Sequence, residues 1–232
     1  RNVIAMARRY DKEDARRRIL SVCVRMFIEK GYHNSKMAEI MKEADVTSST
    51  FHNIFPSKDA VLLELTEFMF GNQFGIAREI VGDDADPVML YAVETAIQMT
   101  LVEQNENLRE IYLEAYSQPV AAEYIYQKTS TELYGIFGSY LPECGESDFY
   151  ELEIGTAGIM CAYMSRPCDK YFTLQRKLNR FLQMSLSAYR VPFERQREVI
   201  AYIMQKDIVA IANAVMQKLF AALAMKYDFT LE

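Results

Sequence analysis

The sequence predicts an all-α protein in which a small three-helix N-terminal domain is followed by a larger helical domain. Apolar residues recur three and four positions apart along most of the 232 residues, which is the periodicity of amphipathic helices. Prolines, glycines and capping residues separate these segments. No stretch alternates apolar and polar residues between turn signals, as a strand would. We place the domain boundary after residue 57, giving segments 1–57 and 58–232.

The first predicted helix runs from Asp11 to Lys30. Its apolar positions are spaced three and four apart, and Gly31 follows where a C-terminal glycine is common. The apolar positions are Ile19, Leu20, Val22, Cys23, Met26 and Phe27.

Two short helices are expected next. One runs from about Lys36 to Ala44, with Ser35 or Asn34 as its cap. The other runs from about Ser48 to Asn53 and is capped by Thr47, whose hydroxyl can accept a hydrogen bond from a first-turn amide.

The larger domain begins with a long helix that starts at Lys58, with Ser57 as its N-cap. Aspartates and Pro87 then mark the start of another helix, because proline suits the first helical turn. The further predicted helices are Val88 to about Gln104, Asn107 to Tyr116, Pro119 to Tyr140, Asp148 to Ser165, Thr173 to Tyr189, and Phe193 to about Tyr227.

Composition narrows the class of protein. The longest charge-free stretch, from Ile154 to Ser165, has too few residues to span a bilayer, which needs about 20. Charged residues interrupt any apolar core near the N-terminus, so no secretory signal is predicted. The four cysteines form no C-x-x-C pair, which favours reduced thiols. We therefore expect a cytoplasmic protein without a membrane partner.

Charge is distributed unevenly along the chain. The whole sequence carries a net charge of −6, but residues 1–60 carry +4 and the remainder −10. A basic N-terminal segment followed by an acidic remainder is expected when only the N-terminal part of a protein contacts the phosphates of DNA. From charge alone, the alternative that Arg16, Arg17 and Arg18 form a solvated helix face stays open.

The two short helices have the spacing of a helix-turn-helix. A turn around residues 45–47 joins them, and apolar residues at Met37, Ile40, Met41, Val46, Phe51 and Phe55 pack them together. In this motif the second helix offers its N-terminal side chains to the major groove. The residues placed to meet base edges are Ser48, Ser49, Thr50, His52 and Asn53. From the pattern alone, a generic pair of short helices in a bundle is the alternative.

The run from Ile19 to Leu62 resembles the DNA-binding domain of TetR-family regulators. About fifty residues match the pattern, with these positions in register: Phe27, Gly31, Tyr32, Ile40, Val46, Thr50, Phe55 and Lys58. The resemblance implies that Thr47 to Asn53 is the recognition helix and that Lys58 clamps a phosphate together with helix-terminal amides. We also assign Ser35 and Lys36 to the DNA-binding set.

Four positions depart from the family pattern. Asp45 stands where glycine is usual, His52 where tyrosine is usual, and Ile54 where histidine is common, while Lys36 replaces the usual threonine cap. These departures bear on individual DNA contacts rather than on the fold. His52 could donate to a phosphate, whereas Asp45 would repel a phosphate that it faced.

By resemblance, the larger domain holds an effector pocket and a dimer interface. Residues 88–170 are rich in Met and Tyr, which suit a hydrophobic or amphipathic effector, although such residues at helical spacing are also ordinary core. The predicted pocket residues are Thr95, Gln98, Met99, Tyr112, Tyr116, Tyr124, Tyr134 and Tyr163.

The last two predicted helices carry more apolar surface than one core can use, which favours a four-helix interface between two subunits. The residues assigned to this interface are Leu178, Phe181, Leu182, Ile208, Ile211, Val215 and Leu219. The alternative is a single, deeply buried final helix.

An enzyme is not expected, and neither is a cofactor or a metal. The two histidines, His33 and His52, both lie in the helix-turn-helix region, which leaves no His-based triad or zinc cluster for the body. No G-x-S-x-G, G-x-G-x-x-G or P-loop string occurs. Glu151 and Glu153 fall on different helix faces and are expected to be solvated.

The sequence therefore predicts a ligand-responsive transcription regulator, a repressor that binds a near-palindromic double-stranded DNA operator as a homodimer. A small hydrophobic or amphipathic effector would release it. The alternative is a helical ligand-binding or interaction protein that no longer binds DNA specifically.

Overall fold

We describe the protein from a computed structural model, over residues 2–71, 74–82 and 86–231 and, for side chains, from residue 11 onward. Within these ranges the chain is helical, without strands, as predicted. The elements are α1 (Asn2–Lys30), α2 (Met37–Glu43), α3 (Ser48–Ile54), α4 (Lys58–Phe70), α5 (Gly75–Val81), α6 (Pro87–Gln104), α7 (Glu106–Ser117), α8 (Pro119–Phe137), a 3-10 turn η1 (Gly138–Tyr140), α9 (Glu146–Met164), α10 (Leu174–Ala188), α11 (Phe193–Gln205) and α12 (Ile208–Tyr227).

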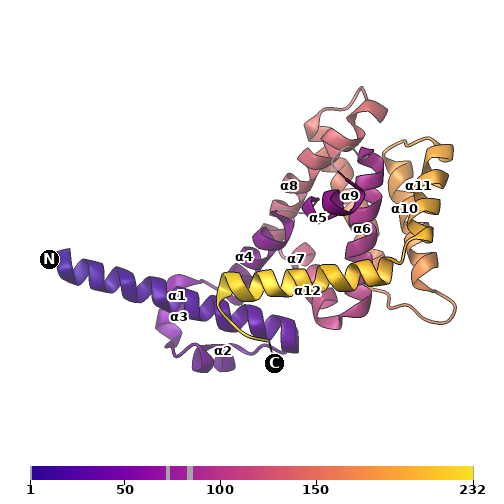
Figure 1. The fold of residues 1–232 in the computed structure, drawn as a ribbon. Coiled ribbons are helices and arrows are strands. Elements are labelled where there is room, and N and C mark those ends of the chain that lie inside the picture. The colour runs from indigo at the N-terminus through magenta and orange to yellow at the C-terminus, as the bar shows by residue number, and fades with distance from the viewer. Residues whose placement is uncertain (1, 72–73, 83–85, 232) are drawn as a thin grey trace.

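The molecule has two parts that share a continuous apolar core (Figure 1). At one end, α1 packs against α2, α3 and α4, and the small domain is centred on fully buried Phe27, Ile40 and Phe51. In the larger part, which we call the body, α6 is the central helix, in contact with each helix from α5 to α12. Because α6 is covered on every side, almost all its side chains from Val88 to Val102 are buried.

Local signals explain most helix ends. Thr47 caps α3 by accepting a hydrogen bond from the Thr50 amide, and Ser57 caps α4 through the Ala60 amide, as predicted. Gly31 has a φ of 85°, a left-handed conformation that glycine adopts without a steric penalty. The prediction of Ser35 or Asn34 as the cap of α2 is wrong, because the N-cap is Lys36, without a side-chain bond.

Several boundaries differ from the sequence-based expectation. Helix α1 begins at Asn2 rather than Asp11, and the helix predicted from Lys58 ends at Phe70, before the separate α5. The helix predicted from Phe193 to Tyr227 is two helices, which separate at Lys206 and Asp207. Lys206 is extended, and the Asp207 carboxylate accepts from the Ala210 amide, so a new helix starts there without a proline or glycine.

The separation at Lys206 and Asp207 lets α12 cross the molecule instead of continuing α11. Helix α12 packs along α6 and reaches α1, as Figure 1 shows in yellow. At its end, the Tyr227 hydroxyl lies 3.5 Å from the Glu64 carbonyl, and Ser21 Oγ donates to the Asp228 carbonyl at 3.1 Å. By length and composition, α12 is the one helix of the described chain that is apolar enough to cross a bilayer. It contacts α1 and α6, and 22% of its apolar window is buried within the described chain.

Candidate functional site

The turn between α2 and α3 is held by a guanidinium group. Asp45, at this turn, has a φ of 50°, a left-handed value that explains why a glycine suits this position. Arg18 Nη1 donates to the carbonyl oxygens of Ala44 at 2.5 Å and Asp45 at 3.0 Å, and Arg18 Nε donates to Asp14 at 3.1 Å. Arg18 is therefore engaged in positioning the turn.

Helix α3 exposes one row of short polar side chains. Ser48, Ser49, His52 and Asn53 are exposed, so they are available to a partner, as predicted for a recognition helix. Thr47 and Thr50 are engaged with each other, because their hydroxyl oxygens lie 3.0 Å apart. His52 Nδ1 lies 3.2 Å from the Pro56 carbonyl oxygen, which ties the ring to the end of its own helix.

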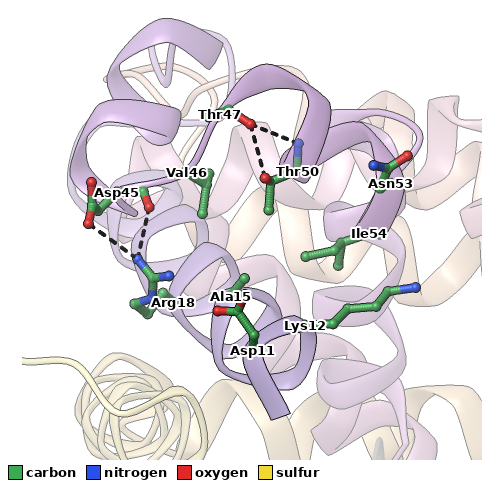
Figure 2. Close-up of a pocket in the computed structure, with 10 residues that line it drawn as sticks. All are labelled: Asp11, Lys12, Ala15, Arg18, Asp45, Val46, Thr47, Thr50, Asn53 and Ile54. Carbon is green, nitrogen blue, oxygen red and sulfur yellow. Dashed lines mark hydrogen bonds and ion pairs between the residues drawn. The ribbon is translucent and has the colours of Figure 1, made fainter. Parts of the chain in front are cut away.

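An open groove of about 520 Å³ runs between α1 and α3 (Figure 2). Lys12 and Asn53 lie on one side of it, and Arg18 and Asp45 on the other. Side chains of both signs line it, so the exposed charge of Asp45 is partly balanced by Arg18, whose Nη1 is 3.9 Å from the carboxylate. Asp45, which stands where the family pattern has glycine, therefore has a cation of its own chain beside its carboxylate.

The two residues assigned at the start of α2 have different surroundings. Ser35 is fully buried and its hydroxyl donates to the Gly31 carbonyl at 2.7 Å. The structure therefore contradicts a direct DNA contact by the Ser35 side chain, which instead closes the turn after α1. Lys36 is exposed and remains available to a phosphate.

Lys58 is partly buried at the start of α4. Its Nζ donates to the carbonyl oxygens of Tyr32 at 2.8 Å and Ser35 at 3.3 Å, and lies 4.0 Å from the centre of the Tyr32 ring. Burial lowers the pKa of Lys58. An ammonium group has three donors, so one remains for a phosphate once two carbonyls are bound. Lys58 thus joins the ends of α1 and α4, a role that the sequence did not reveal.

Comparison with known proteins agrees with this geometry. Residues 19–65, which contain α2, α3 and the start of α4, match the family described as bacterial regulatory proteins, tetR family. Two relatives in Bacillus subtilis (strain 168) are the uncharacterized HTH-type transcriptional regulators YuxN, 24% identical over 105 residues, and YdgC, 29% identical over 104 residues. Residues 19–65 therefore form the N-terminal helix-turn-helix domain of the tetR family of bacterial regulatory proteins.

The relatives match this chain only in part. The alignments cover 45% of the chain with YuxN and 42% with YdgC, and they span 36% and 52% of those proteins. Among solved structures, RolR in complex with its ligand resorcinol has the same fold, with a TM-score of 0.62 and 18% identity. That match covers 82% of this chain and 95% of RolR, so the likeness extends over the body.

In the body, the predicted pocket residues do not form one group. Thr95, Gln98, Met99 and Tyr112 are buried around α6, and Tyr116 is partly buried beside them. The Thr95 hydroxyl donates to the Tyr91 carbonyl at 2.9 Å, so it is used within its own helix. Tyr134 is 39% exposed on α8, whereas Tyr124 on α8 and Tyr163 on α9 are partly buried, as Tyr116 is.

Two carboxyl groups that the sequence-based prediction did not select lie in the body core. Glu94 on α6 and Glu153 on α9 are 6% and 5% exposed. Burial raises the pKa of each to about 8, because a charged carboxylate is costly in an apolar interior. The expectation that Glu153 is solvated is therefore wrong, whereas Glu151 is exposed. An acid in the middle of the apolar stretch from Val88 to Val102 was the available signal for Glu94.

The residues assigned to the dimer interface are mostly core. Leu178, Phe181 and Leu182 are at most 1% exposed inside a single chain, so they cannot contact a second subunit without unpacking. Ile208 and Val215 are also buried, and Ile211 and Leu219 are partly buried against the core. The apolar side chains left uncovered are different ones, and include Ile154 on α9 and Met184 on α10, each 44% exposed. Among the described residues, no group of His, Cys, Asp and Glu is placed to hold a metal ion.

Proposed function

We propose that the protein is a cytoplasmic, ligand-responsive transcription repressor, not an enzyme, that binds a near-palindromic DNA operator as a homodimer and is released by a small hydrophobic or amphipathic effector. The observation that carries the proposal is the exposed polar row on α3, Ser48, Ser49, His52 and Asn53, on a helix held by a capped and clamped turn. Short hydrogen-bonding side chains on such a helix suit base edges in the major groove.

A dimer is supported by the outward face of α9. This face carries Ile154, Gly155, Gly158 and Ala162, all exposed and free of charge, and a Cβ added at either glycine would meet nothing within 4 Å. Helix α10 lies beside it and exposes Met184. Two copies of this helix pair would make a four-helix interface, in which small residues allow close approach of the backbones. Two recognition helices would then meet one face of DNA about 34 Å apart, or a multiple of that distance.

Effector binding is supported by connections between the body and the DNA-binding domain. The Phe70 ring, at the end of α4, lies 5.8 Å from the ring of Tyr112 and 6.1 Å from that of Tyr116, both on α7. The same α7 holds the end of α1, because Asn107 Nδ2 donates to the Ile28 carbonyl at 2.8 Å and Glu110 accepts from the His33 amide at 2.9 Å.

A ligand that displaced α7 would therefore shift α1 and α4 together. Its binding would be reciprocally coupled to DNA binding, by about 1–3 kcal/mol in typical cases. The resorcinol bound by RolR is a small aromatic diol, and the tyrosine-rich body of this chain is compatible with a ligand of similar size.

The test begins with DNA selected from a random library by the full-length chain, followed by fluorescence anisotropy of the selected duplex in a series of salt concentrations. We expect a near-palindromic site that is bound about 10³–10⁷ times more tightly than random DNA. Asn53→Ala should weaken specific binding, whereas Asn213→Ala, at an exposed asparagine on α12, should not. If no duplex is enriched and affinity is independent of sequence, the protein is instead a helical ligand-binding protein without specific DNA recognition.

A further inference from the structure

The body core contains two carboxyl groups without a cation. Among the described residues, no lysine, arginine or histidine forms an ion pair with Glu94 or Glu153. A third acid of the body, Glu103, does have cationic partners. Its carboxylate lies 2.6 Å from Lys177 Nζ and 3.5 Å from Arg109 Nη2. Without a cation beside them, these two buried carboxyls are mostly protonated near neutral pH, and a positive charge brought next to them would favour their ionised form.

A second polar group beside Glu94 is also incompletely bonded. Gln98 lies one turn further along α6, is 4% exposed, and donates its Nε2 to Glu94 Oε1 at 2.8 Å. Its Oε1 is buried and has no hydrogen-bond partner. Turning the amide around would pair the oxygen with a protonated Glu94 and leave the nitrogen unpaired instead. In either orientation the amide keeps one buried polar atom without a hydrogen bond, which is unfavourable unless a ligand supplies the partner.

Tyrosines connect the two acids. On α7, Tyr112 and Tyr116 occupy successive turns: burial, then the neighbouring Glu94, raise the pKa of Tyr112, and burial, then Glu153, raise the pKa of Tyr116. Both rings contact Phe70. Glu94 on α6 is thus a neighbour of Tyr112, Glu153 on α9 is a neighbour of Tyr116, and the two rings meet at Phe70.

Each acid keeps one local hydrogen-bond partner. Glu153 Oε2 lies 3.1 Å from Thr156 Oγ1, which lies 2.7 Å from the Tyr189 hydroxyl. Glu94 has Gln98. These neutral partners orient the carboxyls without supplying a positive charge.

We propose that this region between α6, α7 and α9, bounded by Glu94, Gln98, Glu153 and the Phe70–Tyr112–Tyr116 ring cluster, binds an organic cation with an aromatic body. The inference rests on the proposed function, since it names the chemical class of the effector. A carboxylate gains most from a positive charge when both are removed from water, and tyrosine faces attract cations as well. The free amide atom of Gln98 would bond to a polar group of the same ligand.

The geometry also predicts a proton balance. With a pKa of about 8, an empty Glu94 is about nine-tenths protonated at pH 7. A cation that pairs with it stabilises the ionised carboxylate, so the carboxyl proton passes to the solvent as the ligand binds. A neutral ligand of the same shape leaves that proton in place. Tyr112, which faces Glu94 from α7, keeps its proton at this pH because its pKa is raised.

The test uses the full-length chain and three probes with one skeleton: 4-phenylbutylamine, its trimethylammonium analogue, and neutral 4-phenylbutanol. Isothermal titration at pH 7 in phosphate and in Tris gives both the affinity and the number of protons released. We expect both cations to bind at least tenfold more tightly than the alcohol, with release of close to one proton. Equal binding of the alcohol, binding without proton release, or no binding by either cation would overturn the inference.

Matched variants locate the site. Glu94→Gln preserves shape and should lower cation affinity at least tenfold, and Glu153→Gln provides a second, independent probe of the same site. The control is Glu151→Gln, at an exposed acid two residues before Glu153 on α9. This substitution should leave cation binding unchanged. Wild-type affinity in both Glu94→Gln and Glu153→Gln would contradict the proposed site, whichever probe is used.

The failure of this inference can be distinguished from the failure of the proposed function. Anisotropy of the selected DNA, without any probe, tests DNA binding by itself. DNA binding without a preference for cations overturns only the effector class. Cation binding by a chain that recognises no DNA sequence overturns the proposed regulator and leaves the cation site in place.

Discussion

Replacing Glu94 by glutamine should change how the stability of the protein depends on pH. The folded state raises the pKa of this carboxyl from 4.5 to about 8, so folding favours its protonated form. The stabilisation is complete below the unfolded pKa of 4.5 and is lost as the pH rises through the folded value. From these two values, the loss between pH 5 and pH 8 is about 3.5 kcal/mol for one such carboxyl.

Glutamine has no proton to lose, so Glu94→Gln should reduce the fall in unfolding free energy between pH 5 and pH 8 by about that amount. The groups that face Glu94 do not obscure the effect, because Gln98 does not titrate and burial keeps Tyr112 protonated in this range. Urea unfolding followed by circular dichroism at pH 5, 6, 7 and 8 measures the free energy, provided that the denaturant slope stays constant.

Glu151→Gln is the control for this experiment, because it removes an exposed acid and should follow the wild-type pH profile. Parallel profiles for wild type and Glu94→Gln, within about 0.5 kcal/mol, would refute the reasoning, since they would show that the carboxyl has the same proton affinity in both states.

Three further predictions concern DNA binding and assembly. Lys58→Ala should weaken binding to all DNA sequences alike and reduce the dependence of log affinity on log salt concentration by about one unit, because one phosphate contact is lost. It should also lower the free energy of unfolding by about 1–3 kcal/mol, because two carbonyls lose their donor. An unchanged salt dependence in fluorescence anisotropy would limit Lys58 to its structural role. Ser49→Ala and Asn53→Ala should each reduce the difference in binding free energy between the operator and one of its single-base variants by about 1–3 kcal/mol. Wild-type specificity in both variants would show that these side chains do not contact the bases. Gly158→Glu should give monomers in analytical ultracentrifugation, whereas Gly135→Glu, at an exposed glycine of α8, should not; dimers in both would move the interface elsewhere.

Local patterns in the sequence were sufficient for the helix-turn-helix. The Thr47 and Ser57 caps and the glycine after α1 act within a few residues, so their sequence signals correspond directly to the observed helix ends. The exposed polar row on α3 was equally predictable, because helical spacing decides which side chains share a face.

Contacts between distant segments were decided only by the tertiary structure. The acids at 94 and 153 are buried because α7 covers α6 and α9, and Leu178 is core because α10 packs inward. Helical periodicity shows that a face is apolar, but it does not show whether the same chain or a second subunit covers that face. For the same reason, the sequence did not show that Lys58 bonds to carbonyls at the end of α1, or that the chain turns at Lys206 and brings α12 onto α1. These features depend on how segments far apart in the sequence pack together, which only the folded structure determines.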